Sequence, residues 1–79
     1  MNPTVFSKGP YRFFFFSREE QRAHVHVISA DGEAKFWLEP TVALANYEGL
    51  RDSQIRKIQE IVEANYEEIR AAWKAHFGM

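Results

Sequence analysis

The sequence predicts an α+β fold in which a small antiparallel sheet of three to five strands, made of two consecutive hairpins, packs one face against a single long C-terminal helix. Residues 1–40 contain short runs of β-branched and aromatic residues separated by turn residues. Residues 52–77 repeat apolar residues at three- and four-residue steps, as one side of a helix does. The 79 residues, 46% of them hydrophobic, are enough for one domain, residues 1–79, with a small core.

The first predicted hairpin joins "PTVF" to "YRFFFFS" through the turn sequence "SKGP". Side chains alternate along a strand, so Phe13 and Phe15 point to one face and Phe14 and Phe16 to the other. One pair fits beneath the helix. The other pair is expected on the opposite face, as an exposed apolar patch of the kind that marks a partner or ligand surface, unless the end of the helix or the loop at residues 40–50 covers it.

The second predicted hairpin joins "HVHVIS" to "GEAKFWL". Asp31-Gly32 is a preferred dipeptide for a two-residue type I′ turn, and that turn would pair His26 with Trp37 and His24 with Glu39. One face of this hairpin is then apolar and suits the core. It consists of Val25, Val27, Phe36 and Leu38. The other face collects His24, His26, Ile28, Lys35, Trp37 and Glu39.

The predicted helix begins near Asp52 or Ser53, either of which can cap it, and stops at Gly78. Its apolar stripe consists of Ile55, Ile58, Val62, Tyr66, Ile69, Trp73 and Phe77. The charged residues lie off this stripe, as expected for a helix packed on a sheet. Residues 41–51 are a connector or a short strand, because Val42 and Leu44 alternate as in a strand whereas Ala43, Leu44 and Ala45 would also suit one helical turn.

Composition excludes several classes of protein. The chain has no cysteine, so disulfides and thiolate metal sites are absent. Ten basic and eleven acidic residues, interspersed, do not favour nucleic acid as a partner, although Lys8, Arg12, Arg18 and Arg22 allow a small basic patch. No segment resembles a signal peptide or reaches the roughly 20 apolar residues of a membrane helix. We expect a cytoplasmic protein that is not attached to a membrane.

Three functions are possible for the face that carries His24 and His26, which we call the histidine face. The first is a binding module that docks another protein, or a second copy of the chain, through its aromatic residues. Its predicted contact residues are His24, His26, Lys35, Trp37 and Glu39, together with Phe13 and Phe15 or their alternates.

The other two functions are chemical, and whether the protein is an enzyme stays open. His24 and His26 could act as general base and general acid of a metal-independent ribonuclease, with Lys35 or Arg12 stabilising negative charge. Alternatively, the His-x-His pair and Glu39 could form a three-ligand metal site. A metal is not expected, because Glu39 beside His24 is equally well explained as a surface ion pair, and no cofactor is required. The histidines could also be solvated strand residues without a ligand.

Five segments together resemble one family. "PTVF", "YRFFFFS", "HVHV", "GEAKFWLEP" and the terminal "W…HFG" are similar to the small bacterial domain of unknown function 4160, over nearly the whole chain. The resemblance implies a cytoplasmic prokaryotic protein with strands and helices and supplies no activity. Genes of this kind often neighbour another small gene in an arrangement like a toxin–antitoxin or mobile-element module, which implies a protein partner.

Overall fold

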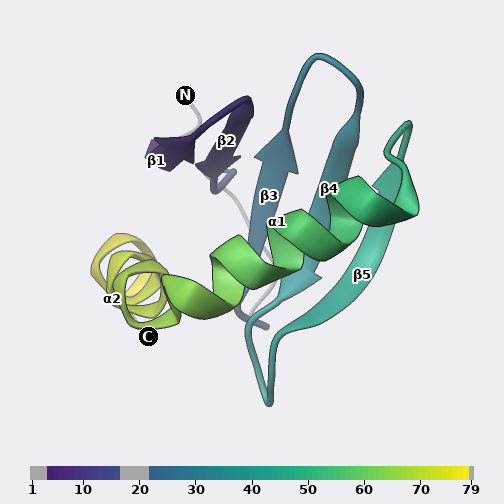
Figure 1. Ribbon diagram of the computed structural model, residues 1–79. Helices are drawn as coiled ribbons and strands as arrows, with labels where there is room; N and C mark the ends of the chain where they lie inside the picture. Colours follow the sequence, from purple (N-terminus) through teal and green to yellow (C-terminus); the bar gives the residue numbers. More distant parts are fainter. Residues whose placement is uncertain (1–3, 17–21, 79) are drawn as a thin grey trace.

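The computed structural model describes residues 4–16 and 22–78. Five strands form one antiparallel sheet in sequence order, and two helices follow them (Figure 1). The strands are β1 (Thr4–Lys8), β2 (Tyr11–Phe14), β3 (His24–Ile28), β4 (Glu33–Trp37) and β5 (Ala43–Glu48), and the helices are α1 (Asp52–Ala64) and α2 (Tyr66–Phe77). The predicted α+β class and antiparallel sheet are therefore confirmed. Residues 43–48 adopt the strand form, one of the two forms that their pattern left open.

The prediction of a single long helix is wrong, because the helix is interrupted at Asn65. This residue has φ −114° and ψ 22°, outside the helical region, and its side-chain Nδ2 donates to the Ile61 carbonyl at 2.8 Å. An asparagine amide that binds the backbone in this way competes with helix continuation. As a result α1 crosses one face of the sheet in front of β3, β4 and β5, whereas α2 is seen nearly end-on beside the sheet (Figure 1).

The second hairpin has a different register from the predicted one. His24 pairs with Trp37 and His26 with Lys35, so each partner is displaced by two residues. The Ser29 N–H donates to the Gly32 carbonyl at 2.9 Å, so the turn lies one residue earlier than expected. Because the displacement is an even number of residues, every side chain keeps its predicted face.

Tertiary contacts of the loop explain this register. A Cβ on Gly32 would overlap the carbonyl oxygen of Glu48, so glycine is needed here for close backbone approach and not for positive φ. The Asp31 carboxylate accepts a hydrogen bond from Gln54 Nε2 at 2.8 Å, and the Gln54 amide oxygen in turn accepts the Arg51 N–H. The loop is therefore docked onto the first turn of α1. The N-cap of this helix is Arg51 and not Asp52 or Ser53 as predicted.

The core lies between the sheet and the helices, as predicted. Val25, Val27, Phe36 and Leu38 are at most 1% exposed, and all seven residues of the predicted helical stripe lie in the core or pack against it. Phe13 and Phe15 are also at most 1% exposed, and the Phe15 ring lies 5.3 Å from that of Trp73. Their predicted place on the histidine face is therefore wrong, and the alternate pair, Phe14 and Phe16, lies there.

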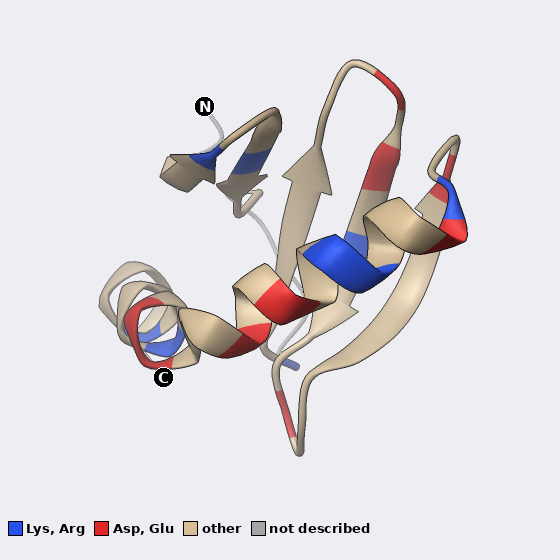
Figure 2. Cartoon of the chain, in the orientation of Figure 1, with Lys and Arg blue, Asp and Glu red and all other residues tan. Residues whose placement is uncertain are grey.

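Charged residues of both signs occur along α1 and on the sheet (Figure 2). This arrangement follows the interspersed charges of the sequence. Within the described residues, no helix is both long and apolar enough to cross a membrane.

Candidate functional site

The sheet face that points away from α1 collects most of the predicted site residues, and we call it the open face. Strand pairing arranges its side chains in rows that run across the sheet. One row consists of Phe14, His26, Lys35 and Asn46. A second row, nearer the loop between β3 and β4, consists of Arg12, Ile28, Glu33 and Glu48. His24 and Trp37 form a pair on the other side of the first row.

His24 belongs to this face by strand alternation, yet its side chain is fully buried. Its ring lies 5.2 Å from Trp73 of α2, 5.6 Å from Trp37 and 5.0 Å from His26. Its Nδ1 is 2.7 Å from the Arg22 carbonyl oxygen. A carbonyl can only accept, so Nδ1 carries the proton and this bond fixes the tautomer. Because the helix is interrupted at Asn65, α2 places Trp73 over His24. The contact between His24 and Trp73 therefore packs the start of β3 against α2.

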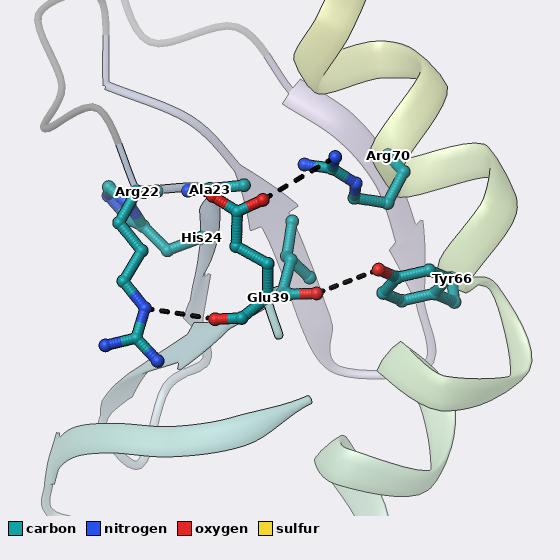
Figure 3. A network of polar contacts seen from close by, with 7 residues as sticks. Arg22, Ala23, His24, Glu39, Tyr66 and Arg70 are labelled. Carbon is teal, nitrogen blue, oxygen red and sulfur yellow. Dashed lines mark hydrogen bonds and ion pairs between the residues drawn. The ribbon is translucent and has the colours of Figure 1, made fainter. Parts of the chain in front are cut away.

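Glu39 is the centre of a polar network that joins three parts of the fold (Figure 3). Its Oε1 accepts the Ala23 N–H at 3.2 Å, and its Oε2 lies 3.7 Å from the Arg70 guanidinium. Its main-chain oxygen accepts from Arg22 Nε at 3.0 Å. Next to it, the Tyr66 hydroxyl donates to the Leu38 carbonyl at 2.9 Å. Glu39 thus stabilises the packing of the start of β3 against α2.

The predicted three-ligand metal set is not gathered in this structure. The observed register pairs His24 with Trp37, so Glu39 is not directly opposite His24 as expected. The Glu39 carboxylate instead contacts a backbone N–H and a guanidinium. Among residues 4–16 and 22–78, no group of three His, Cys, Asp or Glu side chains is placed to hold a metal ion.

His26, unlike His24, is partly exposed and lies in a cluster of aromatic rings. Its ring is 5.6 Å from Phe14 and 4.4 Å from Phe16, and these two phenylalanines are 5.3 Å apart. Phe16 is 40% exposed. Beside the rings lies a hollow of about 260 Å³, which Lys35 and Asn46 also line. We call it the aromatic hollow.

Cations lie against the aromatic rings of the open face. The Arg22 guanidinium is 4.1 Å and the Lys35 ammonium 4.5 Å from the centre of the Trp37 ring, and Arg12 is 4.9 Å from that of Phe14. Such contacts are attractive and hold the cation beside the ring. Acidic side chains occupy the opposite corner of the face, where Glu33 pairs with Glu48. The open face therefore combines exposed rings with positive charge at its centre and at the Arg22 end.

Sequence reasoning missed Arg22 as a neighbour of Trp37. The two residues are far apart in the chain, and the contact depends on the observed register.

A second, larger hollow of about 710 Å³ lies between residues 40–42 and residues 63–68 and is lined by Glu63, Glu67 and Glu68. None of the predicted site residues lines it.

Comparison with known proteins identifies the family. Neither the search of curated proteins nor that of solved structures gave a match. The family model described as a domain of unknown function, DUF4160, matches residues 11–74, from the first residue of β2 into α2. Because this match covers more than half of the chain and agrees with the motifs, the protein belongs to the DUF4160 family.

Proposed function

We propose that this protein is a binding module that docks another protein on the open face. The observation that carries the proposal is that α1 packs on the opposite side of the sheet, while the open face, which α2 meets at His24, presents apolar side chains to solvent. Phe16 is 40% and Ile28 38% exposed, and Trp37 and His26 are partly exposed beside them. Contiguous exposed apolar residues mark interaction surfaces, and aromatic residues flanked by arginine are typical of interface centres.

The geometry supports binding over the two chemical alternatives. A ribonuclease with His24 and His26 as base and acid needs both rings at the substrate. His24 has no exposed surface, and its Nδ1 already donates to a backbone carbonyl. Among the residues that the structure describes, a His-x-His metal site finds no third ligand, since the Glu39 carboxylate contacts Ala23 and Arg70. Both alternatives therefore assign chemistry to residues that stabilise the fold.

The proposed contact residues are revised accordingly. From the predicted set, His26, Lys35 and Trp37 remain. Phe16, which is exposed, replaces Phe13 and Phe15, and Phe14, which is 7% exposed, packs beneath it. His24 is buried beneath Trp73, and the Glu39 carboxylate is held by Ala23 and Arg70, so neither remains a proposed contact residue. In the setting that the family resemblance implies, a bacterial toxin–antitoxin or mobile-element module in the cytoplasm, the partner is the protein encoded beside this one.

Site-specific photo-crosslinking in cells tests the proposal. A benzoylphenylalanine in place of Phe16 should give one discrete adduct, whereas the same residue in place of Arg56, on the exposed side of α1, should give none. Trp37→Ala should abolish the adduct and leave the unfolding temperature nearly unchanged, because Trp37 lies outside the core cluster.

Three outcomes decide the question. An adduct of twice the monomer mass would identify the partner as a second copy of the chain. Equal adducts from positions 16 and 56 would refute a specific surface. A Trp37→Ala variant that unfolds at the growth temperature would show that Trp37 serves stability and would remove it from the contact residues.

A further inference from the structure

We infer that the open face binds an acidic segment of its partner, with one aromatic side chain of that segment in the aromatic hollow and its carboxylates against Lys35 and Arg22. This inference rests on the proposed function and names the chemistry of the partner. Three observations carry it: the size and lining of the hollow, the cations around it, and the polarity of the face.

The aromatic hollow fits a single side chain. Its volume of about 260 Å³ is below the roughly 300–1,000 Å³ of pockets that hold drug-sized ligands. Phe14, Phe16 and His26 supply ring faces and edges on one side, and Lys35 and Asn46 supply polar groups on the other. Aromatic rings at such distances pack edge-to-face or offset. A ring of the partner would continue the arrangement in which Phe16 already meets His26 edge-on, with interplanar angle 73°.

The charges around the hollow favour acidic residues on either side of the partner's aromatic residue. Lys35 lines the hollow itself, and both Lys35 and Arg22 lie within 4.5 Å of the centre of the Trp37 ring. In both contacts the charged group itself lies over the ring, which places the guanidinium and the ammonium together on this side of the open face. A carboxylate docked there gains a charge-assisted contact that the surrounding aromatic surface partly shields from water.

The face also imposes a direction on the bound segment. Glu33 lines the hollow on the side of the loop between β3 and β4, and Glu48 pairs with Glu33. Acidic residues of the partner are repelled from that corner and attracted to the Arg22 end. We therefore place the carboxylates of the segment toward the start of β3 and its neutral or basic residues toward the loop.

A protein segment suits this face better than a nucleic acid. Arg12, Arg22 and Lys35 are opposed by Glu33 and Glu48 on the same face, and the whole chain carries a net charge of −1. A nucleic-acid strand presents a phosphate at every nucleotide, and its binding proteins match it with many cations. An acidic segment with one aromatic residue needs only the charges that are present.

Peptide titrations followed by ¹H–¹⁵N NMR test the inference. The probe is acetyl-DEFDE-amide, with acetyl-DEADE-amide and acetyl-KKFKK-amide as matched peptides that lack the ring or reverse the charge. The probe should shift the indole N–H of Trp37 and leave that of Trp73, which is 1% exposed, in place. The affinity of each matched peptide should be lower than that of the probe by a factor of about ten or more, as expected when a central contact is lost.

Variants assign the binding to the hollow. Lys35→Glu and Phe16→Ala should each lower the affinity for the probe by about tenfold. Lys57→Glu, which makes the same charge change on the exposed side of α1, should leave its affinity unchanged. The amide spectrum of each variant shows whether it is folded.

The outcomes separate this inference from the proposed function. If no acidic peptide binds while the crosslink at position 16 persists and depends on Trp37, the binding module stands and the acidic segment is refuted. If a single-stranded oligonucleotide shifts Trp37 at lower concentration than the probe, with an affinity that falls steeply with salt, the partner is a nucleic acid and the inference is overturned. Equal binding of all three peptides would also overturn it.

Discussion

Replacing His24 with alanine should strongly destabilise the fold, because this histidine is a buried structural residue. Its side chain has no exposed surface and contacts Trp73, Trp37 and His26. The matched variant is His26→Ala, on the same strand and face, where the side chain is partly exposed. The two histidines of the same motif should therefore respond very differently.

The magnitude follows from two contributions. Removing a large buried side chain costs about 3 kcal/mol of unfolding free energy, as other large-to-alanine changes in cores do. Loss of the 2.7 Å bond from Nδ1 to the Arg22 carbonyl contributes about 1 kcal/mol. At roughly 0.1 kcal/mol per residue, the whole domain of 79 residues has only about twice that total. The His26→Ala change should cost about 1 kcal/mol or less.

Urea unfolding followed by far-ultraviolet circular dichroism measures these differences. With a slope near 1 kcal/mol/M, His24→Ala should lower the midpoint by about 3–4 M or unfold the protein outright, whereas His26→Ala should lower it by less than about 1 M. His24→Asn isolates the hydrogen bond, because its Nδ2 is as far along the side chain as Nδ1. The urea midpoint of His24→Asn should be about 1 M higher than that of His24→Ala. Equal midpoints for His24→Ala and His26→Ala would refute the burial of His24 beneath Trp73.

Three further changes test the fold. Val27→Asp should unfold the domain, because Val27 is only 1% exposed and the new charge would be buried without a partner. His26→Asp should leave the domain folded. Equal circular dichroism spectra for the two variants would contradict the assignment of faces. Gly32→Ala should cost about 2 kcal/mol or more, because its Cβ would overlap a backbone carbonyl, and an unchanged urea midpoint would refute this close approach. Tyr66→Phe should cost about 1 kcal/mol through loss of the bond to the Leu38 carbonyl, and a wild-type midpoint would show that the bond adds no stability.

The candidate site was predictable in part from alternation along the strands. His26, Lys35 and Trp37 share a face in the predicted and the observed register, because the displacement of two residues preserves the face of every side chain. The pairing of His24 with Glu39 was not preserved, since it depended on the turn. Asp31-Gly32 is a strong signal for a two-residue turn, but its glycine instead packs against the backbone of residues 48–49, which no local pattern contains.

By itself, the sequence determined the α+β class, the strands of both hairpins, the two faces of the sheet and the apolar stripe that the helices bury. These features follow from periods of two and about 3.6 residues, which each segment carries locally. Only the tertiary structure decided which phenylalanine pair enters the core, where the helix breaks, and that His24 is covered by Trp73. Each of these depends on contacts between residues distant in the chain, because a side chain becomes core or surface only when another element covers it.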